Sequence, residues 1–550
     1  MILRKILHSF FWILMICSVA KAQQPAARDT SAKKQIFIIN SERLNYKKID
    51  SVTEFQSAVG NVIIRQGNTL FYCDSVVLNK TQNMLEAFGH VHINDADSVH
   101  TYSDYLKYTG NDKKAYLNGN VKLTDGKGVL TTNELLYDLN TKIGIYTTGG
   151  KVVNNKTVLT SKEGYYYGET RDVYFKKNVF LVDTNYTVKT DTLLYNTYSD
   201  IATFIVPAEI TSGAHRKIFT KEGYYDLKNK KAYFGSRPEI QDSTTFLVAD
   251  KVANDDSTGF GEASGNVIYE DTAQHVTIYA DNLKSNRKEG SFLATEKPVM
   301  VIKQDQDSIF IAADTLYSAK LSELRKYRKV PVISDSLPAR DSAQTDQDST
   351  NRFFEAYYHV RIFSDSLQAV GDSLFYSGED SVFRLFKSPV VWAQENQIIG
   401  DTIYLYTLNK KPKRMHVFEN ALLINKVGAS YFNQVKGRTI NGYFKDGNIN
   451  YMRAKGNAES IYYAQDDYNK YIGVNRATAD VIDMYFENKK PQKVVFRVNL
   501  VGTTFPMRQV NHEDMKLRGF KWLDNIRPKT KNELLSTPGS HEAKTIFFDH

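Results

Sequence analysis

Apolar and polar residues alternate along most of this chain with a period of two, the spacing expected of β-strands that bury one face. Val121-Lys122-Leu123 shows the pattern. Clusters of Gly, Asn, Asp and Lys, such as residues 109–114, separate the alternating segments and are typical of turns. The pattern predicts many short antiparallel strands joined by hairpins, and therefore an all-β protein.

A short signature, often Gly-Asn-Val, recurs about every 30 residues, which predicts a repeat architecture. Its clearest copies are Gly60-Asn61-Val62, Gly89-His90-Val91, Gly119-Asn120-Val121, Gly265-Asn266-Val267 and Gly456-Asn457-Ala458. Weaker copies fill most of the intervals. About 60 residues separate Pro298-Val299 from His359-Val360, which indicates two periods with one copy masked.

A second signature, Asp-x-Leu-x-Tyr, lies between copies of the first, so each repeat holds at least two strands. Examples are residues 104–108, 191–195 and 372–376. A repeat with one apolar face cannot bury it alone, so neighbouring repeats must stack to complete the core. Because the Asp recurs in most repeats, we interpret it as structural rather than as a calcium ligand or a catalytic acid.

Composition changes along the chain indicate where the repeats begin and end. Residues 334–351 are rich in Ser, Asp, Gln and Thr, which predicts a disordered insertion between repeats at 36–333 and repeats at 352–500. Residues 501–550 abandon the repeat and read as a cap or docking tail, with helices expected around 513–523 and 529–535.

The N-terminus has the features of a secretory signal peptide. Arg4 and Lys5 precede an apolar run over residues 6–19, and Ala20-Lys21-Ala22 is a small-x-small cleavage site. The run is short for a membrane anchor, which needs about 20 apolar residues. We therefore expect cleavage after Ala22, a flexible mature N-terminus over residues 23–35, and a periplasmic protein, either free or associated with the outer membrane.

Charge and cysteine content exclude several classes of protein. The chain has 71 Lys and Arg against 62 Asp and Glu, a formal net charge of +9, and export makes nucleic acid an implausible partner. Its two cysteines cannot supply a disulfide framework or a thiolate zinc site. Tyr and Phe are abundant at 35 and 30 residues, which suits a chain built largely of strands.

The ordered series of signatures, as in Ala312-Ala313-Asp314-Thr315-Leu316-Tyr317, resembles the OstA-like family. This family includes relatives of the periplasmic lipopolysaccharide-transport bridge protein (LptA) and of the N-terminal domain of the outer-membrane translocon (LptD). The resemblance covers residues 36–500, and residues 356–363 and 389–403 are similar to the longer OstA-like proteins of Bacteroidetes.

This resemblance implies an antiparallel β-jellyroll or β-solenoid of ~30-residue repeats whose apolar trough holds the acyl chains of lipopolysaccharide. It also implies partners in the inner and outer membranes and end-to-end self-association. Neither a catalytic group nor a cofactor is needed. The candidate lipid-facing residues are Val62, Ile64, Val91, Ile93, Leu106, Val121, Leu123, Leu193, Tyr195, Val267 and Leu374.

Other candidate chemistry is weaker. His90, His92 and His100 lie near Asp95 and Asp97, residue types that bind zinc, but no ligand set at standard spacing is visible, and strand positions account for them better. Gly259-Phe260-Gly261 lacks the Lys and Ser or Thr of a phosphate loop. We expect no metal site and no enzymatic activity.

Two other classes of protein also fit alternating strands at hairpin spacing. One is an outer-membrane β-barrel, although many Lys and Arg interrupt the strands and the chain ends without a terminal aromatic residue. The other is a structural or adhesive solenoid that stacks repeats without lipid cargo.

Overall fold

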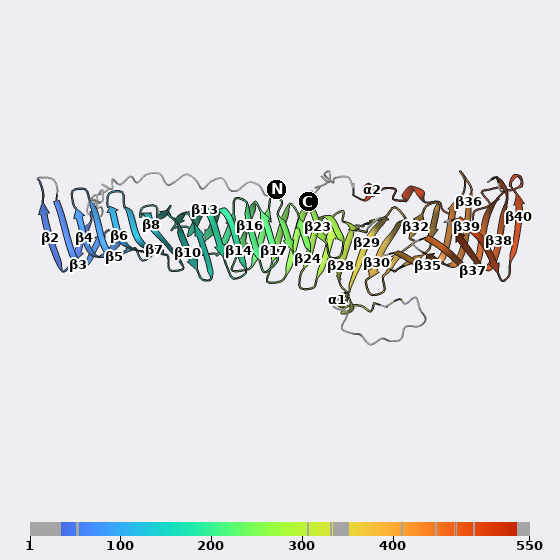
Figure 1. Cartoon of the computed structure of the whole chain (residues 1–550), viewed down its shortest axis with the longest axis horizontal. Coiled ribbons are helices and arrows are strands. Elements are labelled where there is room, and N and C mark those ends of the chain that lie inside the picture. The colour runs from blue at the N-terminus through green and yellow to red at the C-terminus, as the bar shows by residue number, and fades with distance from the viewer. Residues whose placement is uncertain are drawn as a thin grey trace, which may run out of the picture. The chain divides into compact units, whose positions relative to one another are not determined.

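The computed structural model describes residues 35–535 apart from 51–53, 305–306, 331–332, 334–350, 409–410, 446–447, 467, 469 and 488–489. It is almost entirely antiparallel β-structure, as predicted (Figure 1). The chain divides into two compact units. The predicted signal peptide, the mature N-terminus through residue 34, most of the predicted insertion and the last fifteen residues lie outside the described part.

The first unit takes in residues up to Asn155 together with Glu163–Arg171. Consecutive strands pair with one another through most of it. Its strands are β1 (Phe37–Asn40), β2 (Arg43–Lys48), β3 (Glu54–Gln66), β4 (Thr69–Asn79), β5 (Met84–Asp95), β6 (Val99–Thr109), β7 (Lys114–Thr124), β8 (Gly128–Asp138), β9 (Ile143–Tyr146), β10 (Gly150–Asn154) and β12 (Glu163–Tyr167).

The second unit comprises Lys156–Lys162 and the chain from Asp172 onward. Its first half continues the repeat in long and in divided strands. These are β11 (Thr157–Ser161), β13 (Asp172–Val182), β14 (Tyr186–Asn196), β15 (Ile201–Phe204), β16 (Ala208–Ser212), β17 (Arg216–Thr220), β18 (Glu222–Asp226), β19 (Lys231–Gly235), β20 (Glu239–Asp242), β21 (Thr245–Val248), β22 (Lys251–Asp255), β23 (Phe260–Asp271), β24 (Val276–Asn286), β25 (Ser291–Thr295), β26 (Val299–Ile302), β27 (Ile309–Ala312) and β28 (Thr315–Lys320).

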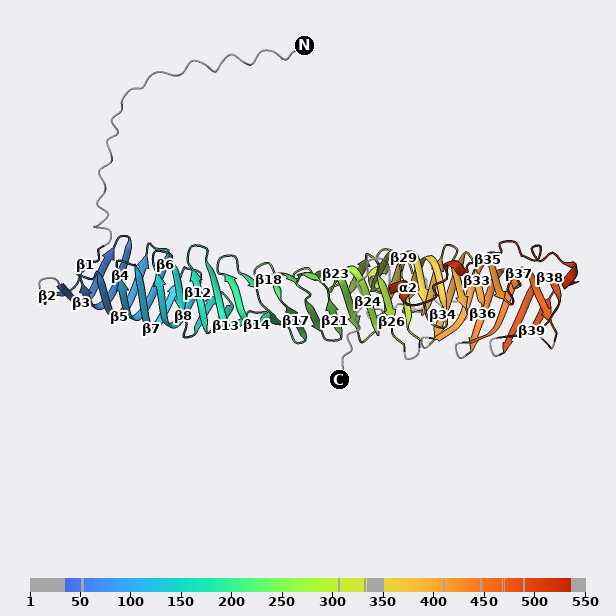
Figure 2. The ribbon, with the colours of Figure 1, turned by 90° about the horizontal axis from the view of Figure 1, so that it is seen from above.

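The remainder of the second unit contains the longest strands and the few short helices (Figure 2). These elements are α1 (Leu321–Arg325), β29 (Arg352–Phe363), β30 (Gln368–Ser377), β31 (Val382–Phe386), β32 (Val390–Ala393), β33 (Asn396–Ile399), β34 (Thr402–Leu408), β35 (Lys411–Lys426), β36 (Phe432–Lys445), β37 (Asn448–Gln465), β38 (Tyr471–Glu487), β39 (Lys490–Arg497), β40 (Val501–Pro506), η2 (Met507–Gln509), η3 (Asp524–Ile526) and α2 (Asn532–Leu535).

The long strands change register at a corner, where the Gly-Asn signature or a residue pair in its place forms a β-bulge in one strand of each pair. In β7, Gly119 and Asn120 have φ of +79° and +46°, and the pairing with β8 shifts between Asn118 and Val121. Gly and Asn tolerate this left-handed conformation better than other residues. The corner divides every long strand into two segments. We call wall A the segments that follow Gly-Asn, with the strands paired to them, and wall B the segments that lie on the other side of the corner.

The side chain of the recurring Asp forms a hydrogen bond with the Asn of the signature, or with the His in its place, at each of several corners. Asp104 Oδ2 accepts a hydrogen bond of 2.7 Å from Asn120 Nδ2. Equivalent contacts join Asp250 to Asn266 (2.8 Å), Asp401 to Asn420 (3.2 Å) and Asp480 to Asn499 (3.0 Å), and histidine replaces Asn in Asp74–His90 (2.8 Å) and Asp314–His359 (2.9 Å). The structural interpretation of this Asp is therefore confirmed at these corners, and His90 occupies an Asn position as the sequence indicated.

Substitution of a corner glycine should loosen the two strands that meet there. In Gly119→Ala the new Cβ would lie 2.7 Å from Asp104 Oδ2, in addition to the strain of φ +79°. We expect a local loss of about 1–3 kcal/mol, measured as faster amide hydrogen exchange in β6 and β7. Gly126→Ala is the matched control, because Gly126 has φ +87° but nothing within 4 Å of its Cβ position. Equal effects of the two substitutions would show that the contact with Asp104 is unimportant.

The structure corrects the interpretation of the long interval between residues 298 and 359. Strand β28 pairs directly with β29, with Lys320 opposite Arg352, so no copy of the repeat is missing. The additional residues lie between these two paired strands in the sequence, and the described ones begin with α1. The interval is long because this connection, rather than the strand pattern, has been extended.

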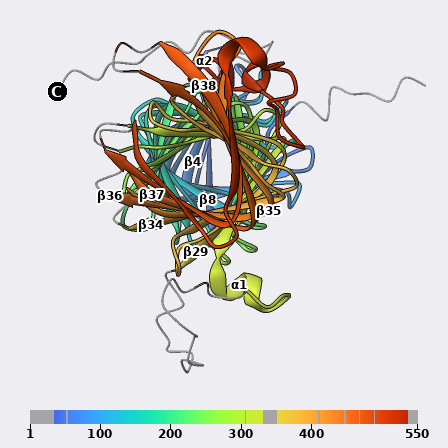
Figure 3. The same ribbon diagram turned by 90° about the vertical axis from the view of Figure 1, so that its right-hand side faces the viewer.

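The C-terminal tail also differs from expectation. Val501–Pro506 is still a strand, β40, paired with β38. No helix forms over residues 513–523, whereas α2 lies within the second predicted helix. Figure 3 shows the segment that carries α2 on the outer side of the second unit's strands, while α1 projects from another side.

Candidate functional site

In each unit, the interior between the two walls is apolar and is the candidate functional site. All eleven residues predicted to face lipid lie in it, and none is more than 2% exposed. Seven come from wall A, namely Val62, Ile64, Val91, Ile93, Val121, Leu123 and Val267; Leu106, Leu193, Tyr195 and Leu374 come from wall B. Their contact with lipid remains a prediction.

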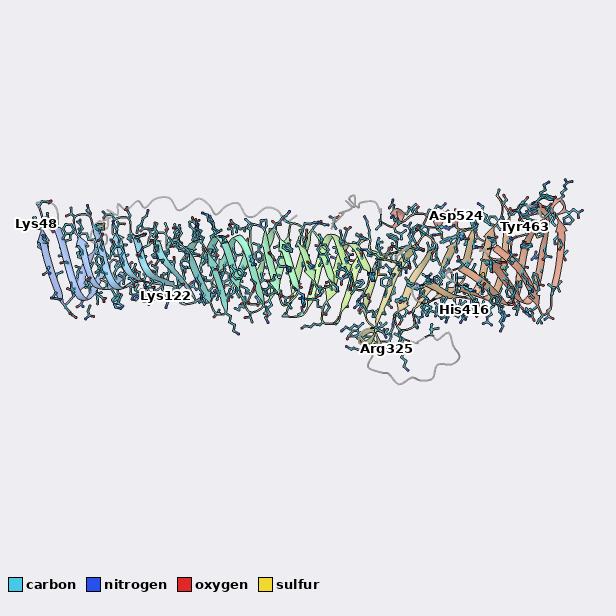
Figure 4. The ribbon with its side chains drawn as sticks, in the orientation of Figure 1. Lys48, Lys122, Arg325, His416, Tyr463 and Asp524 are labelled. Atoms are coloured by element: carbon cyan, nitrogen blue, oxygen red, sulfur yellow. The ribbon has the colours of Figure 1, made fainter. Side chains whose placement is uncertain are left out.

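Side chains of the two walls pack directly against each other. In the first unit, the ring of Phe71 in wall A lies 4.7 Å from that of Tyr108 in wall B. Neighbouring positions point to the opposite side: Lys122 is exposed between Val121 and Leu123, and its side chain lies outside the strands in Figure 4. The period of two thus separates a dry interior from a wet exterior.

Opposite the corner, the hairpin turns of wall A approach those of wall B, and we call this line the mouth. In the first unit, buried tyrosines of the second signature span it. Tyr108 donates to Gln66 Oε1, while Gln66 Nε2 donates to Gly110 O at 2.9 Å. Tyr137 reaches Asp95 Oδ2 at 3.5 Å, and Tyr166 reaches Asp125 Oδ2 at 3.2 Å. Side-chain hydrogen bonds therefore hold this part of the mouth closed.

Burial and the nearby carboxylates raise the pKa of all three of these hydroxyls well above the ordinary value for tyrosine. They therefore stay protonated and remain hydrogen-bond donors. Small residues alternate with them across wall B: Ala115 is opposite Tyr108 and Tyr137, and Gly144 is opposite Tyr137 and Tyr166. Because a small residue lies beside each tyrosine, each ring has space to extend toward the mouth.

In the second unit the mouth carries charged residues. The Arg216 side chain, at the start of β17, is only 10% exposed and makes one contact of 3.4 Å with Asp256 Oδ1. Burial, followed by repulsion from Arg287, lowers the pKa of Arg216 to about 10. Arg287 and Asn254 also contact the same carboxylate. A buried ion pair of this kind closes the mouth with charges where the first unit uses tyrosines.

A narrow apolar cavity lies in the interior of the second unit, near Arg216. Wall A contributes Leu181, Val188 and Ile210, and wall B contributes Ala202, Phe204 and Phe234. Its lining also includes Tyr186 and Tyr225, whose rings face each other across the mouth at 4.2 Å. Among the described residues, none accepts a hydrogen bond from Tyr225.

The outer surface of wall A is apolar in the C-terminal part of the second unit, a feature that the sequence analysis missed. A row of paired residues crosses five strands on this surface: Trp392, Gln397, Ile424, Gln434 and Ile461, none more than 1% exposed. The signal was present, because Val390-Val391-Trp392 and Leu422-Leu423-Ile424 are apolar at every position, which indicates strands covered on both faces.

Residues 507–535 cover this outer row, and we call them the tail. Met515 and Leu517 pack against Ile424 and Ile461. In Figure 4, Asp524 of the tail and Tyr463 of β37 lie along the same side of the second unit.

Two buried glutamines hold the tail through its backbone. Gln434 Nε2 donates to Met515 O at 2.8 Å, and Gln434 Oε1 accepts from Leu517 N at 2.8 Å. Gln397 makes the same pair of bonds with Lys521 O (2.6 Å) and Leu523 N (2.7 Å). Each carboxamide thus bonds one C=O and one N–H of the tail backbone, as the backbone of a neighbouring β-strand would.

Candidate metal and redox chemistry finds little support among the described residues. His92 Nε2 lies 3.1 Å from His100 Nδ1, but no group of three or more metal-binding side chains occurs in the described part of the chain. Burial raises the pKa of the Cys73 thiol to about 12, so it is protonated and unreactive at neutral pH. Within the same residues, no helix is long and apolar enough to cross a membrane.

Comparison with known proteins gives one family. Residues 33–191 and 165–250 match the model of the OstA-like protein family. Among 21 matching solved chains is LptH, described as the LptA-homologous periplasmic component of the lipopolysaccharide transport device from Pseudomonas aeruginosa. LptH is 16% identical; the match covers 19% of this chain and 79% of LptH, with a TM-score of 0.18. No curated protein matches.

Proposed function

We propose that this chain, whose residues 33–250 match the model of the OstA-like family, is a periplasmic lipid-transport protein that carries lipopolysaccharide toward the outer membrane. The acyl chains would lie between the two walls. The proposal rests mainly on the apolar interior, which is bounded on one side by continuous strands and on the other by side-chain contacts across the mouth. Such a space can take up hydrocarbon chains once the mouth opens.

No catalytic group is required for this function. Burial of apolar surface releases roughly 25 cal/mol per Å², so each methylene that enters the interior contributes about 0.8 kcal/mol. The phosphorylated head groups would remain outside, where basic side chains such as Lys122 can meet them. During transport the acyl chains would then pass from one apolar environment to another.

Exposed strand edges suit the expected partners. Within the described part of the first unit, β2 pairs with β3 alone, and Leu44 and Tyr46 are more than half exposed. Val501 of β40 in the second unit is 70% exposed. Edges of this kind accept a further strand. We propose that they join other transport components or a second copy of this chain.

Photocrosslinking in cells tests the proposed function. A photoreactive residue at Val121 or Leu193 faces the interior, and one at Lys122 or Thr192 is the matched control on the next position of the same strand. We expect adducts with lipopolysaccharide from the two interior positions and few or none from the controls, because only the interior shields acyl chains from water. Equal labelling of both sets, or none in folded protein, would contradict lipid transport.

A second candidate function is that of a closed structural solenoid without cargo. The near-complete burial of the eleven candidate residues favours it, because the interior is already filled by side chains. The same crosslinking experiment separates the two functions: a structural solenoid gives no lipid adduct at Val121 or Leu193.

A further inference from the structure

We propose that the cavity beneath Tyr186 and Tyr225 is a lateral entry site for a hydrocarbon chain of an anionic amphiphile. This inference rests on the proposed function and locates a place where lipid first enters the interior from the side. The main evidence is that the rings of Tyr186 and Tyr225, which line an apolar cavity, pack against each other across the mouth without a hydrogen bond between them.

The contacts across the mouth differ between this position and the first unit. Tyr108, Tyr137 and Tyr166 are each fixed by a hydrogen bond to a polar side chain of wall A. At Tyr225 the corresponding contact is an aromatic pair with Tyr186, at 4.2 Å and 51°. Separating a tyrosine from a carboxylate breaks a hydrogen bond and leaves a donor and an acceptor unpaired. Separating two aromatic rings breaks no hydrogen bond. The mouth should therefore open more easily at Tyr186 and Tyr225 than at Tyr108, Tyr137 or Tyr166.

The walls beneath the rings accept only apolar groups. Leu181, Val188 and Ile210 face Ala202, Phe204 and Phe234, and no charged side chain lines the cavity. Ala202 lies between Tyr195 and Tyr225 in wall B, so the smallest side chain of the lining is next to the mouth. Outward movement of the two tyrosine rings would widen the narrow cavity toward solvent and admit a linear chain.

The positive charge of Arg216, beside the two rings, favours a ligand with an anionic head group. Arg216 is close enough to Tyr225 for each to affect the ionisation of the other. Its guanidinium has five N–H donors, and among the described residues its one hydrogen-bond partner is Asp256, at 3.4 Å. A carboxylate or phosphate outside the mouth would bind the unused donors while the chain of the same molecule occupied the cavity.

Photolabelling of the purified full-length protein tests the site. The probe is a saturated fatty acid with a diazirine near its methyl end, and mass spectrometry locates the adducts. We expect adducts at residues that line the cavity. Ala202→Phe should reduce them about tenfold, because the new ring fills the space under Tyr225. Ala115→Phe is the matched control: Ala115 is buried between Tyr108 and Tyr137, where the mouth is hydrogen-bonded, so this change should leave the cavity adducts unaltered.

A second variant tests the site independently in case Ala202→Phe does not fold. Tyr225→Ala removes one ring of the pair, and we expect severalfold faster labelling of the cavity, whereas Tyr137→Phe should change it little. Adducts elsewhere in the interior, with none at the cavity and no response to these variants, would overturn the entry site but leave lipid transport intact. Absence of any interior adduct would contradict the proposed function itself.

Discussion

Removal of residues 507–550 is expected to destabilise the second unit strongly around β32–β38. The tail buries Met515, Leu517 and Leu534, each 7% exposed or less, and fully burying such a side chain contributes about 1.5–3 kcal/mol. Gln397 and Gln434 would also exchange their backbone partners for water, at about 0.5–1.5 kcal/mol for each hydrogen bond. The expected loss is on the order of 5 kcal/mol or more.

Amide hydrogen exchange measures this effect locally. We expect protection to fall in the outer-row segments of β33, β35 and β37, and the exposed row around Trp392 to cause self-association visible by light scattering. Deletion of residues 536–550 alone is the control and should leave both measurements unchanged. If the longer deletion also leaves exchange unchanged, the tail contributes little to the stability of these strands.

The replacement of Asp483 is expected to have the next largest effect. Its side chain is fully buried in β38 and accepts hydrogen bonds from Arg453 Nε (2.7 Å), Tyr451 (2.6 Å) and Arg497 Nε (2.6 Å). Asp483→Leu removes these bonds and leaves the two arginines unpaired. Because both arginines are about half exposed, they can regain water, and we expect a loss of about 3 kcal/mol, at the lower end for broken buried pairs.

The same residue predicts a dependence on pH. The hydrogen bond from Arg453, followed by those from Tyr451 and Arg497, holds the pKa of the Asp483 carboxyl well below its ordinary value. Its contribution is therefore complete above the pKa of an unfolded Asp, about 4, and is lost as the pH falls below that value. Thermal unfolding of the protein and of Asp483→Leu should differ most near neutral pH and converge in acid.

Asp480→Asn supplies the matched control for Asp483. Asp480 lies in the same strand, and its side chain accepts one hydrogen bond from the described part of the chain, from Asn499 at an exposed corner (3.0 Å). We expect this substitution to lower stability by less than about 1 kcal/mol. An equal effect of the two substitutions, or a pH profile unaltered by Asp483→Leu, would show that the buried carboxylate is not specially stabilised.

Much of the fold followed from the sequence because one face of each strand is buried. The alternation in Val121-Lys122-Leu123 requires Val121 and Leu123 to share a face, and both are buried in wall A. The corner was also visible, since Gly119 and Asn120 are suited to positive φ. The sequence could not show which repeats close the mouth by hydrogen bonds, because Tyr137 and Tyr225 occupy equivalent positions and differ only in their partners across it.

The tail could not be predicted from local pattern. A helix was expected around residues 513–523, yet these residues are not helical. Gln397 and Gln434 satisfy part of the tail's backbone from more than 80 residues away in the sequence, so the usual advantage of a helix in pairing its own amides is reduced. Such long-range partners leave no periodic signal in the segment that they bind.

The order in which the chain is made gives the tail a particular place in assembly. Most strands pair with near neighbours in sequence, as β36 does with β37, so pairing can proceed from the N-terminus while later residues are still being added to the chain. Leu517 instead binds Gln434, 83 residues earlier, and Arg527 binds Gln368, 159 residues earlier. The tail can dock only after β30, β33 and β36 have formed. Its docking therefore marks the end of folding for the C-terminal half of the second unit, and a chain that stops short of residue 507 would complete its strands with that surface still uncovered.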